Sequence, residues 1–283
     1  MKRIIVTGAA GGIGFSVIKY LNEYCNEYCN EYCNAYFIYA LDIKEVQKLK
    51  NVKGIVCDLT KEDNIRYAYD LIKNDLGDAK IDAIIHLSGT YSMDSLIEIE
   101  EDKLKKIFDI NFFSVYLVNK IFFDLLDKNS KIIITSSEVA PLDPLPFNSI
   151  YSLTKNTLEN YALALRQELN LLDIKVILVR PGAINTGLID ESIKHVERVE
   201  KETKLYKDNA PLFKDIVKNN ESKTIEPIEI AKLMKKILDK KNPKLLYTIN
   251  LNYKLILLSS LPKRLQLFII KKMITPNKSE EEK

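Results

Sequence analysis

The sequence lacks the long apolar runs, the concentrated basic segments and the cysteine pattern that mark several large classes of protein. No uninterrupted apolar run reaches the roughly 18–20 residues that a helix needs to cross a bilayer. The formal net charge of +3 is spread along 283 residues, which argues against a nucleic-acid partner. Three of the 4 cysteines lie in one short repeat, so they do not form the framework of a disulfide-stabilised protein.

A secretory signal is also absent from the start of the chain. Residues 1–6, MKRIIV, run directly into a glycine-rich turn, so neither a longer apolar stretch nor a small-residue cleavage site precedes Gly8. We therefore expect a cytoplasmic protein. The apolar content of 46% and the charged content of 29% are ordinary for a soluble globular domain.

Short apolar runs alternate with longer amphipathic segments. Most of these runs are continuous in Ile, Val and Leu, as expected of parallel strands that are buried on both faces. The order predicts an α/β fold, a Rossmann-type doubly wound parallel sheet of about seven strands flanked by helices in a single domain. The predicted strands are residues 3–7, 36–41, 54–57, 81–87, 131–136 and 175–180, with a weaker seventh at 245–249, and examples of predicted helices are residues 61–76, 101–127 and 152–171.

The domain is expected to span residues 1–250, followed by an apolar extension at 251–274 and a polar tail at 275–283. Residues 255–270 are interrupted by Pro262-Lys263-Arg264. We expect this segment to pack on the core or to cover a substrate pocket. Peripheral contact with a membrane surface is the alternative, and a hydrophobic dimer surface is another.

Residues 22–34 read NEYCNEYCNEYCN, a four-residue unit repeated three times. On a helix the three cysteines, Cys25, Cys29 and Cys33, would form a slowly twisting row. Their spacing matches no zinc pattern. We interpret the repeat as a lengthened surface helix and predict no metal site.

A glycine-rich turn joins the first predicted strand to the first predicted helix. Missing side chains allow positive φ and a close approach of the backbone to a pyrophosphate, and the helix N-terminus offers free N–H groups. Such turns also join strands to helices without a ligand. The predicted cofactor-binding residues of this turn are Gly8, Gly11, Gly12, Ile13 and Gly14.

Acidic and small residues at the next strand ends extend this prediction. Asp42 can accept hydrogen bonds from both adenosine ribose hydroxyls and would repel a 2′-phosphate, so NAD is favoured over NADP, although Lys44 is available to a phosphate. The alternative for Asp42 is a turn or capping role. Asp58 and Leu59 are predicted to contact adenine. Ser88 and Gly89 are predicted to lie against the cofactor.

A chemical site is predicted from Ser137, Tyr151 and Lys155. Tyr151 and Lys155 are four residues apart and share a helix face. A nearby cation lowers the pKa of a phenol, so Tyr151 can act as a general base or acid. Ser137 can orient the substrate oxygen, and Asn111 can hold a water that links Lys155 to solvent. Taken singly, each residue also has an ordinary structural explanation, and only their combination after the glycine turn indicates hydride transfer.

The chain resembles the short-chain dehydrogenase/reductase family over residues 3–240, and the three-residue gap between Gly8 and Gly12 is similar to its small single-domain branch. The resemblance implies a catalytic tetrad of Asn111, Ser137, Tyr151 and Lys155. Tyr151 and Lys155 also bind the cofactor in this family. The resemblance further implies cofactor contacts from the loop residues Pro181, Gly182, Ile184 and Thr186. His86-Leu87-Ser88-Gly89 departs from the family's Asn-Asn-Ala-Gly, and we interpret His86 as a strand-end residue.

The expected function is an NAD(P)-dependent oxidoreductase that acts on a hydrophobic secondary alcohol or ketone. The alternative is a catalytically silent dinucleotide-binding regulatory protein. Residues 190–223 are predicted to form a mobile lid, and helices 101–127 and 152–171 to pair in a homodimer or homotetramer. The predicted pocket walls are Tyr91, Met93, Leu142, Leu145, Phe147, Leu188 and Ile189.

Overall fold

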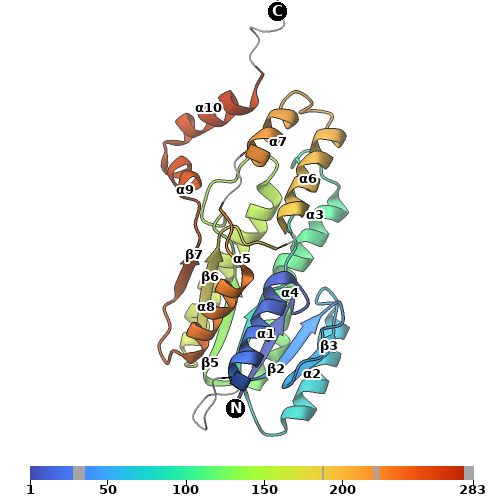
Figure 1. Ribbon diagram of the computed structural model, residues 1–283, viewed down its shortest axis with the longest axis vertical. Helices are drawn as coiled ribbons and strands as arrows, with labels where there is room; N and C mark the ends of the chain where they lie inside the picture. Colours follow the sequence, from blue (N-terminus) through green and yellow to red (C-terminus); the bar gives the residue numbers. More distant parts are fainter. Residues whose placement is uncertain (28–35, 187, 220–222, 277–283) are drawn as a thin grey trace, which may run out of the picture.

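The computed structural model describes residues 1–27, 36–186, 188–219 and 223–276. Within these residues, seven parallel strands form one sheet in the order β3-β2-β1-β4-β5-β6-β7 (Figure 1). The predicted fold class is therefore confirmed. The strands are β1 (Lys2–Thr7), β2 (Tyr36–Asp42), β3 (Val52–Val56), β4 (Ile81–His86), β5 (Leu126–Thr135), β6 (Lys175–Pro181) and β7 (Leu246–Ile249).

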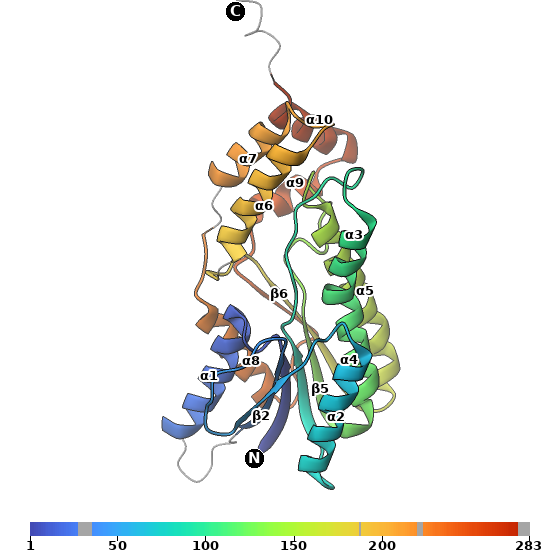
Figure 2. The ribbon, with the colours of Figure 1, turned by 90° about the vertical axis from the view of Figure 1, so that its right-hand side faces the viewer.

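Helices cover both faces of the sheet because alternate strand residues are apolar on both sides. Along β1, Ile4 and Val6 belong to the core beneath α1 and α8, whereas Ile5 belongs to the opposite core beneath α2, α4 and α5 (Figure 2). The order in which strands are added to the sheet reverses between β1 and β4, so a crevice is expected at the carboxyl ends of these two strands. The helix bounds are α1 (Gly12–Glu27), α2 (Glu62–Leu76), α4 (Ser114–Phe122), α5 (Ser149–Asn170) and α8 (Pro227–Asp239).

The predicted helix at residues 101–127 is wrong at its centre and at its end. It divides into α3 (Glu101–Phe108), a π-helical turn (Asp109–Phe113) and α4, and a 3₁₀ turn (Phe123–Leu125) leads directly into β5. Leu126 is buried and pairs with Ile81 of β4, and the Ser130 hydroxyl donates to the Ile81 carbonyl at 2.8 Å. Pairing with a strand distant in sequence therefore overrides the helical pattern, and β5 starts earlier than predicted.

Helices from the last third of the chain gather beyond the carboxyl ends of the strands (Figures 1 and 2). The predicted lid, residues 190–223, contributes α6 (Leu188–Glu202) and α7 (Ala210–Asn219). The apolar segment 255–270 lies within α9 (Tyr253–Ser260) and α10 (Lys263–Ile274), which are separated at Pro262. The Asn209 side chain donates to the Ile274 carbonyl at 2.6 Å, so the end of α10 lies beside the start of α7. Among the helices that the structure describes, none is both long and apolar enough to cross a bilayer.

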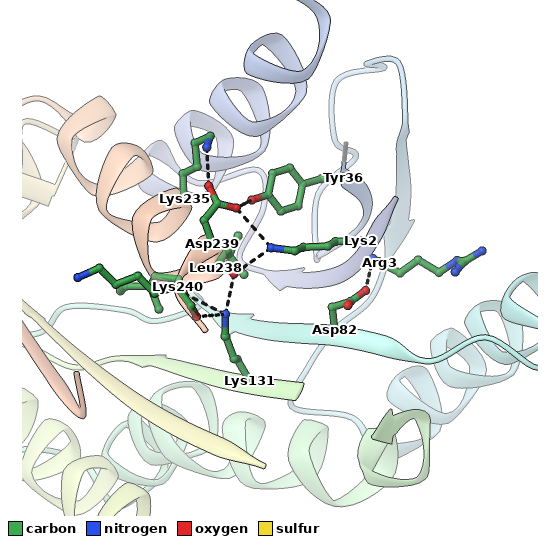
Figure 3. A network of polar contacts seen from close by, with 10 residues as sticks. Lys2, Arg3, Tyr36, Asp82, Lys131, Lys235, Leu238, Asp239 and Lys240 are labelled. Atoms are coloured by element: carbon green, nitrogen blue, oxygen red, sulfur yellow. Dashed lines mark hydrogen bonds and ion pairs between the residues drawn. The ribbon is translucent and has the colours of Figure 1, made fainter. Parts of the chain in front are cut away.

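A polar network ties the C-terminal end of α8 to residues of β1, β2 and β5 (Figure 3). The Lys131 ammonium donates to the carbonyls of Leu238 and Lys240 at 2.6 and 2.8 Å, and so satisfies acceptors that a helix end leaves free. Lys2 and Tyr36 bind the neighbouring Asp239 carboxylate. These contacts hold α8 over the strands that support the site. Residues 28–34 of the cysteine repeat lie outside the described residues.

Candidate active site

A cavity with a volume of about 1190 Å³ lies at the carboxyl ends of β4, β5 and β6. One part of its wall comes from the loops that follow these strands and from the start of α5. The other part comes from α7, α9 and α10 and is mainly apolar, with Lys218 and Lys254 among its residues. The cavity therefore combines polar groups near the sheet with an apolar region away from it, which is typical of a small-molecule site.

Ser137, Tyr151 and Lys155 line the same cavity. Because α5 begins at Ser149, Tyr151 and Lys155 lie one turn apart on the same face. The Lys155 ammonium nitrogen lies 5.7 Å from the centroid of the Tyr151 ring, and the Ser137 hydroxyl hydrogen-bonds with the Tyr151 side chain. Lys155 Nζ also donates to the Thr135 carbonyl at 3.3 Å. A phenol, a hydroxyl and an ammonium group are thus brought together.

Burial shifts the pKa values of this pair in opposite directions. Burial raises the pKa of Tyr151, the hydrogen bond with Ser137 opposes the rise, and the charge of Glu138 adds to it. Burial lowers the pKa of Lys155 to about 8, against the opposing effect of Glu159. In the protein without a bound cofactor, Tyr151 is therefore a phenol, and an additional positive charge nearby would favour its ionisation.

Asn111 lies in the π-helical turn and is fully buried. Its amide nitrogen donates to the Thr90 carbonyl at 2.9 Å and to Thr154 Oγ1 at 3.0 Å, and its oxygen accepts from the Thr90 N–H at 2.7 Å. Asn111 therefore braces the loop after β4 against α5. A Cβ atom on Gly89 would lie 3.4 Å from Asn111 Oδ1 and 3.5 Å from Lys155 Nζ, so both side chains face this glycine.

The glycine turn has the geometry that a dinucleotide requires. Gly8 has a φ of +67°, and a Cβ atom there would lie 2.6 Å from the Ser88 backbone nitrogen. A Cβ atom on Gly14 would lie 2.0 Å from the Gly8 carbonyl oxygen. Only glycine permits this tight passage from β1 into α1. Gly11 and Gly12 are exposed at the start of α1, whose first-turn N–H groups have no intrahelical acceptors.

Two buried hydroxyl oxygens on the cavity wall have no hydrogen-bond partner in the described chain. They are Thr135 Oγ1 and Ser136 Oγ, at the end of β5. Each of them has less than 1 Å² of accessible surface, so a molecule in the cavity would not reach either oxygen. The fit to a nicotinamide dinucleotide rests instead on the glycine turn, where the backbone can approach a pyrophosphate closely.

Asp42 lies at the end of β2 beside the glycine turn. Its two carboxylate oxygens accept from the Ala10 and Lys44 N–H groups at 2.9 and 3.0 Å. Each oxygen keeps a lone pair that can accept from a ribose hydroxyl. The Asp58 carboxylate accepts from the backbone and hydroxyl of Thr60, and Leu59 packs in the core beneath α2. Adenine contacts by Asp58 and Leu59 stay a prediction.

The remaining predicted cofactor residues surround the same crevice. The Ser88 hydroxyl lies 3.2 Å from the Thr7 hydroxyl, and Ile13, Pro181, Gly182 and Ile184 line the cavity. Thr186 lies beside Gly12, since a Cβ atom there would be 2.9 Å from Thr186 Cγ2. Position 182 also requires glycine, because a Cβ atom there would lie 1.8 Å from the Asn250 carbonyl oxygen.

The predicted pocket walls are only partly correct. Tyr91, Met93 and Leu145 line the cavity. Leu142 instead lines a small neighbouring pocket, and Phe147 is buried behind the wall, where its ring packs against Tyr206 and Phe213 at 5.4 and 5.2 Å. The loop 141–148 folds back on itself, so its apolar residues do not all point the same way. The side chains of Leu188 and Ile189 lie outside the described residues.

Two residues near Tyr151 escaped the sequence analysis. The Glu138 carboxylate lines the cavity and accepts from the Asn252 N–H at 2.5 Å, which ties the start of α9 to the end of β5, and burial raises the pKa of this carboxyl. His195 of α6 stacks edge-on with Tyr91 at 6.0 Å, and Tyr91 in turn contacts the Tyr151 ring at 4.9 Å. The position of Glu138 directly after Ser137 could have predicted that it lies near the site. No feature of the sequence indicated the same for His195.

His86 is not part of the cavity wall. It is buried at the end of β4, its Nε2 lies 2.8 Å from the Asn119 amide oxygen, and burial lowers its pKa to about 4. Its contacts are those of a strand-end residue that holds β4 to α4.

Comparisons with known proteins agree with this geometry. The short chain dehydrogenase family model matches residues 2–197. The 3-ketodihydrosphingosine reductase of Bacteroides thetaiotaomicron is 26% identical over 241 residues, covering 85% of this chain and 84% of that protein. Estradiol 17-beta-dehydrogenase 2 of Mus musculus is 26% identical over 195 residues, and the match covers 66% of this chain and 49% of the mouse protein.

Solved structures share the fold. A short chain dehydrogenase family protein from Francisella tularensis superposes with a TM-score of 0.69 at 24% identity, covering 88% of this chain and 97% of that chain. The glycine turn, the parallel sheet and the Ser-Tyr-Lys arrangement are thus found in a chain whose first two thirds match one family model. The chain belongs to the short-chain dehydrogenase/reductase family, whose members are NAD(P)-dependent oxidoreductases.

Proposed function

We propose that the protein transfers a hydride between NAD and a hydrophobic secondary alcohol or ketone. The observation that carries the proposal is the convergence of Ser137, Tyr151 and Lys155 at a cavity whose far wall is apolar. The loops after β4 and β6 and the glycine turn would hold the cofactor beside this group of residues.

A bound nicotinamide cofactor would supply the hydride acceptor or donor, and the chain would supply the proton. In ketone reduction, the Ser137 hydroxyl would donate to the substrate oxygen, and the Tyr151 phenol would give that oxygen its proton. In alcohol oxidation, the Tyr151 phenolate would take the proton of the substrate hydroxyl. Lys155 favours the phenolate through its charge, so Tyr151 serves as acid in one direction and base in the other.

The composition of the cavity wall supports the proposed substrate class. Its distant part is built from aliphatic side chains of α7, α9 and α10, among them Ile216, Leu258 and Ile270. Such a wall favours an apolar substrate. The names of the two similar proteins, a 3-ketodihydrosphingosine reductase and an estradiol dehydrogenase, are consistent with a large apolar alcohol or ketone.

Replacing Tyr151 with Phe tests the mechanism. We expect kcat for a cyclic or long-chain ketone to fall by roughly 10²–10⁴-fold, because general acid catalysis is removed, while the dissociation constant of the cofactor, measured by fluorescence titration, stays within about twofold. Tyr161→Phe is the matched control, since Tyr161 lies on the same helix and bonds to Asn119 outside the cavity. Full activity of the Tyr151 variant would refute the proposed role.

The proposed preference for NAD depends on Asp42. Replacing Asp42 with Ala removes the carboxylate that would repel a 2′-phosphate, so the ratio of kcat/KM with NAD to that with NADP should fall by at least about tenfold. Steady-state kinetics with both cofactors measures this ratio. A wild-type enzyme that prefers NADP would show that Lys44, not Asp42, governs the choice.

A cytoplasmic homo-oligomer is part of the same proposal. The outer surfaces of the π turn, α4 and α5 carry apolar side chains that are 37–47% exposed in the single chain, namely Phe113, Tyr116, Leu153 and Leu163. Pairing of these helices between two copies would cover them. Sedimentation of the intact chain as a monomer at micromolar concentration would contradict this part of the proposal.

A further inference from the structure

Helices α9 and α10, residues 253–274, are called the C-terminal hairpin here. The outer surface of this hairpin is unusually apolar for an exposed surface. Scattered exposed apolar residues are ordinary, but here they are concentrated on two consecutive short helices. Such a concentration of exposed apolar side chains indicates an interaction site. Its members, each 44–79% exposed, are Tyr253, Leu257, Leu265, Leu267, Phe268 and Met273.

The charge of this region is of one sign. Residues 240–279 contain nine Lys and Arg residues and no Asp or Glu, whereas the whole chain has 42 basic and 39 acidic residues. The rest of the chain is therefore net acidic. On the hairpin, Lys254, Arg264, Lys271 and Lys272 are exposed beside the apolar side chains. An apolar surface bordered by basic residues complements an anionic lipid bilayer, and it would repel a second copy of itself.

The inner surface of the hairpin is part of the candidate active site. Leu255, Leu258 and Ile270 line the cavity, and Met273 and Lys254 both line it and are exposed, so they mark a mouth at the hairpin. The hairpin is held in place by Asp143, which accepts from Lys263 and, at 3.0 Å, from Gln266. α10 also ends beside the α6–α7 loop, which carries the exposed Leu205.

We propose that the C-terminal hairpin docks on an anionic phospholipid surface and that the cavity receives its substrate from the lipid phase. Tyr253, Leu257, Leu267 and Phe268 enter the headgroup boundary, while the basic residues contact lipid phosphates. The mouth beside Met273 then faces the bilayer, and an apolar substrate passes into the cavity without crossing water. Docking itself does not depend on the proposed function, whereas delivery of the substrate does.

Flotation of the intact protein with lipid vesicles tests docking without any turnover. We expect binding to phosphatidylcholine vesicles that contain phosphatidylglycerol, much weaker binding to phosphatidylcholine alone, and a decrease as salt rises, because screening weakens attraction between surface charges. Absence of flotation with anionic vesicles, or equal flotation with both, would overturn the proposal.

Two double variants separate the apolar and the basic contributions. Leu267→Asn with Phe268→Asn should lower the vesicle partition coefficient at least about tenfold, and Lys271→Gln with Lys272→Gln should lower it roughly twentyfold on anionic vesicles. Leu171→Asn is the matched control, because Leu171 is 83% exposed and lies before the amino end of β6, whereas the hairpin lies beyond the carboxyl ends of the strands. Wild-type flotation by both double variants would refute docking through the hairpin.

Delivery of the substrate from the bilayer is tested by comparing the turnover of two ketones, one soluble in water and one embedded in vesicles. With a water-soluble ketone, the Leu267/Phe268 variant should keep wild-type turnover, since neither side chain lines the cavity. With a long-chain ketone embedded in anionic vesicles, turnover should fall in parallel with flotation. Loss of turnover with both ketones would show that the two substitutions disturb the folded site itself, and would count against delivery from the bilayer. Retention of both, with flotation lost, would overturn delivery from the bilayer while leaving the proposed oxidoreductase activity intact.

Discussion

Tyr151 and Lys155 are enclosed to different degrees, and their surroundings favour the neutral form of each group. Tyr151 is half-buried on the cavity wall, and Lys155 is 6% exposed. With its pKa lowered to about 8, Lys155 still carries its charge at neutral pH. Because the phenol of Tyr151 is protonated there, the resting protein is prepared for reduction. Oxidation needs the phenolate, so its rate should rise with pH.

His86 links single-residue burial to the stability of the whole protein. Burial lowers its pKa from 6.5 to about 4. Between these values the unfolded chain binds a proton that the folded protein does not, so the free energy of unfolding decreases as pH falls from about 6.5 towards 4. The full difference corresponds to about 3 kcal/mol.

His86→Gln removes this titration and keeps a donor for Asn119. Urea unfolding at pH 7.5 and at pH 4.5 measures how much unfolding free energy each protein loses on acidification. We expect this loss to be smaller in the variant than in the wild type, by up to about 3 kcal/mol. His195→Gln, which removes the second of the chain's 2 histidines, serves as the control. The same acid sensitivity in wild type and the His86 variant would contradict this account.

At the scale of elements, α6 is anchored to the loop after β4. The Asp94 carboxylate, whose side chain is 6% exposed, accepts from Lys103 of α3 and from Arg198 of α6 at 2.6 and 2.8 Å. Burial alone would raise the pKa of Asp94, but hydrogen bonds from Lys103, Ser92 and Arg198 hold it below its ordinary value. This ion-pair cluster fixes the position of the predicted lid over the cavity.

Asp94→Asn should loosen α6 without touching the cofactor. We expect a loss of about 2–3 kcal/mol in stability, because two cations lose a buried anionic partner, together with a several-fold rise in KM for the substrate and an unchanged cofactor dissociation constant. Thermal unfolding and steady-state kinetics measure both effects. Glu62→Gln is the control, since its pair with Arg66 is exposed and contributes under about 1 kcal/mol. An unchanged KM would show that α6 does not depend on this cluster.

At the scale of the whole molecule, the sheet and its two helical layers form the nucleotide-binding body, and α6, α7, α9 and α10 form a cap at one end (Figure 2). The cavity lies between them. The division we propose at residue 250 separates the body from the two C-terminal helices. Asp143 binds Lys263 and Gln266 of α10, and Glu138 binds Asn252, the residue before α9.

A chain that ends at Asn252 tests this division. It keeps the hydrogen bond to Glu138 and removes α9 and α10. We expect cofactor binding within about twofold of the intact chain, while kcat/KM for a long apolar ketone falls at least about tenfold because part of the apolar wall is lost. A small ketone should be affected much less. An equal loss for both ketones, or loss of cofactor binding, would place α9 and α10 within the folding unit.

The sequence by itself determined the parts of this protein that depend on neighbouring residues. Continuous apolar runs predicted the strands of the sheet, the glycine turn predicted the passage from β1 to α1, and a separation of four residues placed Lys155 one turn from Tyr151. These features follow from helix period, pleat and the lack of a glycine side chain, which are local properties of the chain.

Only the tertiary structure decided the features that depend on contacts between distant residues. Pairing with Ile81 turned residues 126 and 127 from predicted helix into strand, and packing against α7 drew Phe147 away from the cavity. Folding of α9 and α10 over the site gave it an apolar wall. Glu138 reached the cavity wall, and His195 reached Tyr91 beside it, for the same reason. The energy of such contacts depends on which segments meet, and a local pattern carries no record of its distant partner.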